Sequence, residues 1–280
     1  ESFADKARYR CEGGGRMTLA RRFAYRWLEP VFGKIYNTLR RVRPLEMLMD
    51  FILSKLSPHI GIPFLEAIRS SGSMEEDWDN RARLNSLIAA TGHADEEAAA
   101  GSARVGLEFS VLKGINTDQT WKVLEIGCGV GNLLRPLSTE VAEAHGVDIS
   151  SEMLRQARER ARGYSNVFLH KTEGELDMFP DDYFDFVYSS GVFIHFPSKP
   201  LVYTYFKEAA RVLKPKSTFR FHVDGRSYLR WRSEKGGTLR GVVFSMVEIK
   251  ENLEAHGFQV AEMSGEGSID CWTTAILGKS

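Results

Sequence analysis

The residues most suggestive of chemistry form a glycine-rich turn at residues 123–131, which read Val-Leu-Glu-Ile-Gly-Cys-Gly-Val-Gly. The apolar first half predicts a buried strand, and a helix is expected to begin near Asn132. Glycines at 127, 129 and 131 let the backbone turn sharply and approach a ligand closely, because no Cβ stands in the way. A turn of this kind between a strand and a helix indicates a cofactor site.

Two acidic residues near this turn suit a cofactor. Asp148 ends the next predicted strand, 17 residues after Gly131, close to the spacing at which a carboxylate reaches ribose hydroxyls. The alternative role for Asp148 is capping of the helix that follows. Glu125 lies inside the first strand, where a carboxylate could act through water or backbone on a cationic amino-acid head group. The alternative for Glu125 is a strand-end acid that contacts solvent.

The glycine spacing argues against a nicotinamide dehydrogenase, which also combines a strand, a glycine turn and an acid. The fingerprint of those enzymes places the third glycine three positions after the second. Here Asn132 occupies that position, and Gly131 comes two positions after Gly129. A dinucleotide site would also have no need of a carboxylate at Glu125.

Around these residues, strand-like apolar runs alternate with helical patterns, which predicts a mostly parallel sheet covered on both faces. Strands are expected at residues 122–127, 145–149, 167–170, 184–189, 218–223, 259–263 and 271–277. Helices are expected at residues 74–90, 95–112, 132–140, 151–162, 201–212 and 246–256.

Several segments resemble, in order, motifs of the class I S-adenosylmethionine-dependent methyltransferases. Residues 123–134 resemble the first motif of this family and residues 147–150 the second, and residues 179–188, 208–215 and 253–258 match later ones. The resemblance implies a doubly wound α/β fold with a seven-stranded, mostly parallel sheet and a reversed last strand. It also implies methyl transfer with S-adenosylmethionine as the cofactor. Residues 214–217, Lys-Pro-Lys-Ser, lack the two glycines usual after the proline, which predicts an altered turn.

The resemblance further implies a set of cofactor contacts. The glycine turn would contact the amino acid and sugar, Asp148 the ribose, and Ile149 the adenine. Glu173 would meet the adenine amino group, with backbone groups near Gly174 as the alternative. Arg81 would pair with the cofactor carboxylate, or is a plain surface arginine. The full expected set is Arg81, Glu125, Gly127, Cys128, Gly129, Gly131, Asp148, Ile149, Met153, Glu173, Gly174 and Ser190.

Three further residues are candidates for catalysis. Methyl transfer from a sulfonium is an in-line displacement, so positioning of a deprotonated acceptor supplies most of the rate. His195 follows the fourth strand, in a segment that lines the cleft in relatives, and is the candidate base. Alternatively, it only braces a helix. His222 and Asp224 end the fifth strand and are candidates to hold the acceptor.

Composition narrows the function classes. The chain has 37 Lys and Arg and 37 Asp and Glu, and no basic stripe interleaved with aromatics marks its catalytic half, which argues against nucleic acid. Its three cysteines are too few and too scattered for a disulfide framework or a metal cluster. No apolar run is long enough to predict a membrane span. We expect a cytoplasmic protein, with contact at a membrane surface left open.

Three parts are expected along the chain. Residues 1–16 are interpreted as a disordered lead-in or vector-derived remnant, and residues 74–280 as the cofactor-binding domain. Residues 17–73 form a basic, amphipathic helical extension, whose apolar stripe is costly to leave in water. That stripe is expected to pack on its own domain or in a homodimer through these helices, with a membrane surface as the alternative.

The sequence thus predicts an enzyme that methylates an oxygen or nitrogen of a small molecule, such as a sugar, a lipid or a secondary metabolite. The alternative is a non-catalytic cofactor-binding or scaffold protein on the same fold.

Overall fold

The computed structural model describes residues 73–93, 96–229, 233, 238 and 241–278. The chain divides into two compact units, Glu1–Arg69 and Ser70–Ser280, and the described residues all belong to the second. The predicted lead-in and basic helical extension lie outside the described residues, apart from Ser73, and stay predictions. Within the described part, no helix has both the length and the apolar character that crossing a bilayer requires.

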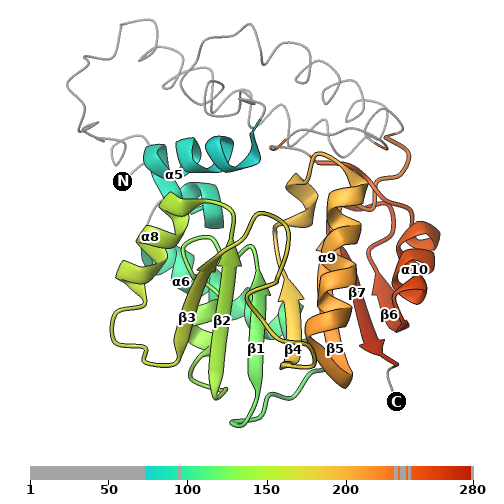
Figure 1. Cartoon of the computed structure of the whole chain (residues 1–280). Helices are drawn as coiled ribbons and strands as arrows, with labels where there is room; N and C mark the ends of the chain where they lie inside the picture. The colour runs from blue at the N-terminus through green and yellow to red at the C-terminus, as the bar shows by residue number, and fades with distance from the viewer. Residues whose placement is uncertain (1–72, 94–95, 230–232, 234–237, 239–240, 279–280) are drawn as a thin grey trace, which may run out of the picture. The chain divides into compact units, whose positions relative to one another are not determined.

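The second unit is built on a seven-stranded sheet with the order β3-β2-β1-β4-β5-β7-β6 (Figure 1). Strands β1 to β5 run parallel, whereas β7 is antiparallel to both of its neighbours, β5 and β6. The predicted doubly wound sheet with one reversed strand is therefore confirmed. The strands are β1 Lys122–Ile126, β2 Glu143–Asp148, β3 Val167–Lys171, β4 Phe184–Ser189, β5 Leu213–Val223, β6 Phe258–Ser264 and β7 Cys271–Leu277.

Helices precede, connect and follow the strands. The α-helices are α5 Met74–Thr91, α6 Glu96–Gly106, α7 Leu134–Leu137, α8 Ser151–Arg160, α9 Lys199–Val212 and α10 Met246–Ala255. A π-helical turn, η2, covers Leu107–Val111, and a 3-10 turn, η3, covers Phe193–His195. The start of α10 is fixed by a capping box between Ser245 and Glu248, which satisfies backbone N–H groups that the helix leaves unpaired.

Two hydrophobic clusters cover the two faces of the sheet. Successive side chains of a strand point to opposite faces. In β1, Leu124 and Ile126 pack with residues of α9 and α10, whereas Val123 packs with Leu107 of η2 and Leu134 of α7. The nearly continuous burial of β1 is what a strand covered on both faces requires.

The helix after the glycine turn is shorter than its apolar pattern predicts. The prediction covers residues 132–140, whereas α7 covers only Leu134–Leu137. Pro136 has no backbone N–H, so it cannot bond to the carbonyl of Asn132. The backbone N–H of Arg135 still bonds to Gly131, and that of Ser138 to Leu134, so single helical turns persist on either side.

Residues 214–217, which lack the glycines usual in the family after Pro215, lie inside β5. This strand starts at Leu213, earlier than the predicted residue 218. Lys216 has a φ of 64°, in the left-handed region where a side chain costs free energy and glycine does not. The lysine therefore occupies a backbone conformation that would suit a glycine.

The parallel strands bring the candidate residues to one edge of the sheet. Ile126, Asp148, Ser189 and Val223 are the last residues of β1, β2, β4 and β5. In open α/β sheets, ligands bind outside these carboxyl ends, at the point where the strand order reverses. In this sheet that point lies between β1 and β4, because the chain moves outward through β2 and β3 before it returns to β4.

Candidate active site

The glycine turn is tied tightly to the neighbouring strand. Gly127, Gly129 and Gly131 have φ values of 77°, 51° and 73°. The N–H groups of Gly127 and Cys128 both donate to the carbonyl of Val147, at 2.8 and 2.9 Å. A Cβ on Gly127 would lie 2.3 Å from a methyl of Val192. Glycine at 127 is therefore required by both backbone conformation and space.

The carboxylate of Asp148 is held by backbone N–H groups on both sides. Its Oδ2 accepts from Gly129 at 2.8 Å and its Oδ1 from Ser150 at 2.8 Å. Burial raises the pKa of Asp148 to about 6; these backbone donors act against the rise, and the charge of Asp79 adds to it. The carboxylate is thus fixed in position but incompletely stabilised as an anion, which suits a group that gains further donors from a ligand.

Within the part of the chain that the structure describes, two buried oxygen atoms in the same pocket have no hydrogen-bond partner. Glu125 is 2% exposed, and its Oε2 has no hydrogen-bond partner among the described residues. The Oδ1 of Asn132 is also unpartnered there, although its Nδ2 donates to the carbonyl of Ala99 at 3.0 Å. Burial raises the pKa of Glu125 to about 8, and the charge of Asp148 adds to the rise, while the nearby Tyr188 hydroxyl opposes it. Buried acceptors without donors are costly, so both favour a ligand with cationic or N–H donors.

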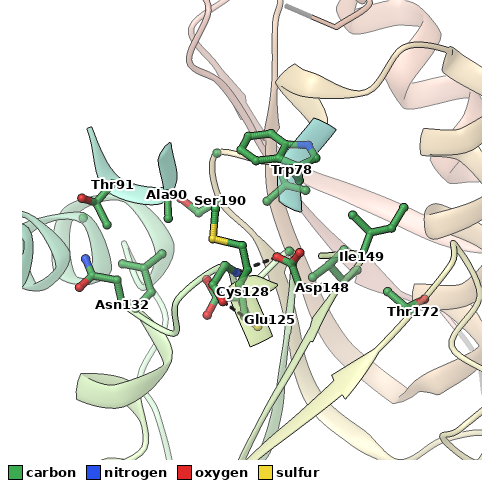
Figure 2. A pocket seen from close by; sticks show the side chains of 18 of the residues that line it. Trp78, Ala90, Thr91, Glu125, Cys128, Asn132, Asp148, Ile149, Thr172 and Ser190 are labelled. Carbon is green, nitrogen blue, oxygen red and sulfur yellow. Dashed lines mark hydrogen bonds between the residues drawn. The ribbon is translucent and has the colours of Figure 1, made fainter. Parts of the chain in front are cut away.

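These groups line a single pocket at the carboxyl edge of the sheet (Figure 2). The walls come from the ends of β1, β2 and β4, from α5 and α6, and from α9. The residues are Met74, Trp78, Ala90, Thr91, Ser102, Ala103, Gly106, Glu125, Ile126, Gly127, Cys128, Gly129, Asn132, Leu133, Asp148, Ile149, Met153, Thr172, Ser190, Gly191, Val192, Phe196 and Tyr205.

Most of the predicted cofactor residues meet in this pocket. Glu125, Gly127, Cys128, Gly129, Asp148, Ile149, Met153 and Ser190 all line it. Gly131 does not line it but closes the turn, where its N–H donates to the Cys128 carbonyl at 2.8 Å. Burial raises the pKa of the Cys128 thiol well above its usual value, so this cysteine contributes shape and not a thiolate.

Three predicted cofactor residues lie elsewhere. The guanidinium of Arg81 donates to the carbonyl and the hydroxyl of Thr238, at 2.8 and 2.9 Å, and its Cζ lies 4.6 Å from the centre of the Trp78 ring. Glu173 is exposed, and its neighbour Thr172 lines the pocket instead. Gly174 is buried and donates to the Thr172 hydroxyl at 3.1 Å. Direct cofactor contacts by these three residues stay predictions.

His195 lies at the margin of the pocket, and the other two catalytic candidates lie apart from it. The ring of His195 meets the ring of Trp78 edge to face, with centroids 5.2 Å apart, and its chain neighbour Phe196 lines the pocket. His222 is buried, its Nδ1 accepts from the Gly191 N–H at 3.4 Å, and burial lowers its pKa to about 4. Asp224 is fully buried in a two-point ion pair with Arg226.

Sequence reasoning did not find several pocket residues, because they come from distant helices. Helix α5 supplies Thr91 to the pocket, and α6 supplies Ser102 and Ala103. The sequence predicted both helices but not which side of each helix lines the pocket. Tyr205 comes from α9. Asn132 was placed at a helix start, and its buried, unpaired oxygen was the signal that only packing reveals.

Comparison with known proteins agrees with this geometry. A family model described as a methyltransferase domain matches residues 123–216. The phosphoethanolamine N-methyltransferase of Plasmodium falciparum is 30% identical over 116 residues, which cover 40% of this chain and 43% of that protein. The demethylmenaquinone methyltransferase of Tropheryma whipplei is 34% identical over 94 residues, 34% of this chain and 38% of that protein. The chain thus spans about two fifths of the length of these relatives.

Solved structures share the fold at low sequence identity. Magnesium protoporphyrin IX methyltransferase from Synechocystis PCC 6803, with bound SAH, has a TM-score of 0.55 and 18% identity and covers 74% of this chain and 99% of its own. A [4+2]-cyclase, SpnF, has a TM-score of 0.52 and 16% identity and covers 72% of this chain and 96% of its own. These likenesses establish the fold alone.

The fold, the ordered motifs and the family match together define the class. This chain contains a class I S-adenosylmethionine-dependent methyltransferase domain, and S-adenosylmethionine is its cofactor.

Proposed function

We propose that this chain transfers the methyl group of S-adenosylmethionine to an oxygen or nitrogen atom of a small molecule. One observation carries the proposal: the half-buried carboxylate of Asp148, at the end of β2, accepts a hydrogen bond from Gly129 in the same pocket as the Glu125 oxygen that has no partner among the described residues. A ribose diol supplies two donors for a carboxylate, and an amino-acid ammonium supplies donors for a second acid. The ligand that carries both groups is the family's cofactor.

Each part of the pocket has a role in holding this ligand. Asp148 would accept hydrogen bonds from the two ribose hydroxyls. Glu125 and Asn132 would attract the ammonium group of the methionyl part. Ile149 and Met153 provide an apolar surface suited to adenine. When bound, the cofactor supplies a methyl group on a positively charged sulfur, and attack by the acceptor breaks the carbon–sulfur bond.

Proton removal from the acceptor is assigned to His195 in this proposal. A hydroxyl or protonated amine must lose its proton as the new bond to carbon forms. His195 lies beside Trp78. It belongs to the segment that follows β4, which also supplies Ser190 and Val192 to the pocket. His222 suits this task less well, because burial lowers its pKa to about 4 and its Nδ1 faces the Gly191 backbone.

The names of the relatives favour a small-molecule methyl acceptor but do not identify which molecule this chain methylates. The names of two of them specify phosphoethanolamine and demethylmenaquinone, which differ widely in polarity. The proposed acceptor class therefore stays broad: a sugar, a lipid or a secondary metabolite. The extension at residues 17–73 is proposed to cover this acceptor side or to join two subunits, with peripheral membrane contact as the alternative.

A non-catalytic cofactor-binding or scaffold protein is the second candidate, because the fold by itself does not specify methyl transfer: one fold neighbour is named as a cyclase. The two candidates differ in product. The full chain, incubated with methyl-labelled S-adenosylmethionine and a small-molecule extract fractionated by polarity, should release S-adenosylhomocysteine and place label in one fraction. Binding of the cofactor with no label transfer into any fraction would favour the second candidate.

A further inference from the structure

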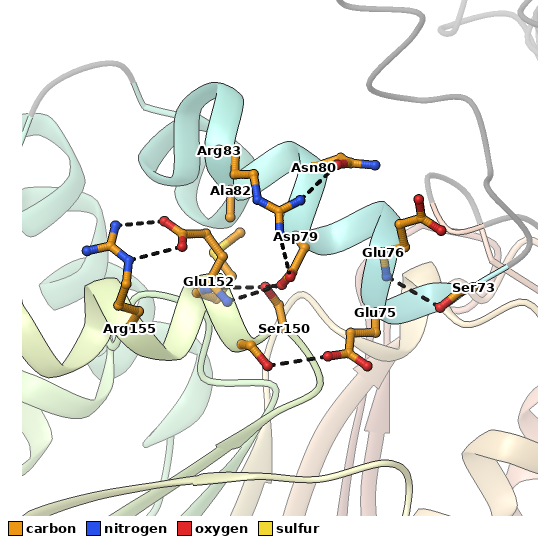
Figure 3. Close-up of polar contacts among 12 residues, drawn as sticks. Ser73, Glu75, Glu76, Asp79, Asn80, Ala82, Arg83, Ser150, Glu152 and Arg155 are labelled. Carbon is orange, nitrogen blue, oxygen red and sulfur yellow. Dashed lines mark hydrogen bonds and ion pairs between the residues drawn. The ribbon is translucent and has the colours of Figure 1, made fainter. Parts of the chain in front are cut away.

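A carboxylate outside the pocket is connected to Asp148 by one serine. Asp79 of α5 accepts from the Ser150 hydroxyl at 2.6 Å and from the Glu152 N–H at 3.1 Å, both through Oδ1 (Figure 3). Its Oδ2 pairs with Arg83 at 3.0 Å. Asp79 therefore lies on the amino-terminal end of α8, where unpaired N–H groups and the helix dipole favour a negative charge.

Ser150 connects the carboxylate of Asp79 to Asp148, the residue proposed to bind the ribose. It is fully buried and caps α8, with its Oγ accepting from the Met153 N–H at 3.0 Å. Its hydroxyl proton goes to Asp79, and its backbone N–H donates to Asp148 at 2.8 Å. Asp148 in turn holds Gly129. A continuous hydrogen-bonded chain thus runs from α5 through the α8 cap to the glycine turn.

The same helix also forms part of the pocket wall. Met74 and Trp78 line the pocket and lie four residues apart, on one stripe of α5. Glu75 and Asp79 form the adjacent stripe and face α8 and β3, where Glu75 bonds to the Ser151 hydroxyl at 3.3 Å and to Lys171 at 2.6 Å. Of these two acids, Asp79 is the one that reaches the buried cap.

We propose that Asp79 is a positioning residue of the cofactor site: through Ser150 it fastens α5, and with it Trp78, over the pocket and fixes the place of Asp148. The inference rests on the proposed function, because it takes the pocket ligand to be S-adenosylmethionine or its product. Loss of the contact between Asp79 and Ser150 would leave α5, which forms one wall of the pocket, less firmly attached. It would also leave the carboxylate of Asp148 less firmly positioned. Asp79 itself does not touch the cofactor.

The negative charge of Asp79 affects the pKa of Asp148, which a purely steric role of Asp79 would not do. Asp148 is surrounded by Asp79 from α5, Glu125 from β1, Cys128 from the glycine turn and Tyr205 from α9. The charge of Asp79 contributes to the raised pKa of Asp148, behind the larger effect of burial. Removal of that charge should therefore lower the pKa of Asp148.

The test measures release of the cofactor product and ionisation of Asp148 in the full chain. Labelled S-adenosylhomocysteine, chased with excess unlabelled ligand, should leave Asp79→Ala about tenfold faster or more than the parent, as expected for a lost hydrogen bond to a charged group. In Asp79→Asn, which keeps the shape and serves if the alanine variant fails to fold, the carboxyl carbon resonance of Asp148 should titrate at a lower pH than in the parent.

Arg83→Ala is the matched control, because it removes the exposed partner of Asp79 and keeps the contact with Ser150. It should release the product within about twofold of the parent rate and should not lower the pKa of Asp148. Parent-like release and parent-like titration in the Asp79 variants would overturn the inference while the proposed function stands. Failure of the parent chain to bind the ligand would overturn the proposed function, and the inference with it.

Discussion

The carboxylate of Asp148 accepts a hydrogen bond from the backbone N–H of Gly129 at 2.8 Å. Asp148 ends β2 and Gly129 lies in the turn that follows the neighbouring strand β1. This bond joins the carboxylate proposed to bind the ribose and the glycine turn into one unit. A ligand that contacts either of them is therefore oriented by both. The predictions below follow from this unit and from the groups around it.

The stability of the ligand-free chain should fall as the pH rises, because of Glu125. Its pKa in the folded chain, about 8, lies above the ordinary value of 4.5. A raised folded pKa gives stability that is complete below about pH 4.5 and is lost as the pH rises through about 8. Within this window the free energy of unfolding should fall by up to about 1.4 kcal/mol per pH unit. Urea unfolding should show this fall in the parent and a weaker one in Glu125→Gln.

Cofactor binding should release protons near neutral pH. An ammonium beside Glu125 favours its ionised form, so a carboxyl that is mostly protonated in the free chain must lose its proton. Calorimetric titrations at pH 7, in buffers with different ionisation enthalpies, should report this release in the parent. A parent that releases no protons would show that Glu125 does not pair with the ligand's cation.

The backbone at Lys216 predicts a stabilising substitution. Its φ of 64° is unfavourable for a side chain but available to glycine. Lys216→Gly should raise the free energy of unfolding by about 0.5–1 kcal/mol, after the greater flexibility of glycine in the unfolded chain is deducted. Chemical denaturation measures the change. Lys214→Gly, at a position without positive φ, should give no such gain.

His195→Ala should lower the maximal rate of methyl transfer by roughly 10²–10⁴ if the histidine removes the acceptor's proton. Affinity for S-adenosylmethionine should stay near the parent value, because His195 does not line the cofactor pocket. His222→Asn is the comparison, and it should act mainly on stability, since His222 is buried between Gly191 and Trp272. Parent-level activity in His195→Ala would make that histidine structural.

A chain that begins at Ser73 should fold and bind the cofactor but lose acceptor turnover or its oligomeric state. The sheet, core and pocket described above are all formed by residues from Met74 onward, so we expect them to form without the residues before Ser73. Light scattering and the activity assay are the measurements. Full activity in an unchanged oligomeric state would contradict both the lid and the dimer hypotheses, and liposome flotation of the whole chain would then test membrane contact.

The parts of the fold and site that depend on neighbouring residues in the sequence could be predicted. The glycine turn, Asp148 and the strands follow from local patterns, and the sheet with its reversed strand follows from their order and the family resemblance. The carboxyl ends of parallel strands necessarily meet at one edge, so Glu125 and Ser190 could also be placed near the turn.

Contacts between distant segments could not be predicted in this way. A helical pattern places Arg81 on α5, but only packing shows that its guanidinium bonds to Thr238. The sequence does not distinguish the partners of Asp224 and Asp79. In the structure, Asp224 pairs with Arg226, whereas Asp79 accepts a hydrogen bond from an N–H group at the start of α8. A pattern of residue types does not say which partner a charged side chain meets.

Calorimetric titration of the full chain with S-adenosylmethionine, in the parent and in Asp148→Ala, tests the central claim most directly. We predict one site per chain in the parent and a loss of about 1.5–3 kcal/mol of binding free energy in the variant, as expected for hydrogen bonds to a charged group. Asp181→Ala, an exposed acid paired with Arg211, should bind like the parent. No binding by the parent, or unchanged affinity in a folded Asp148→Ala, would contradict the account.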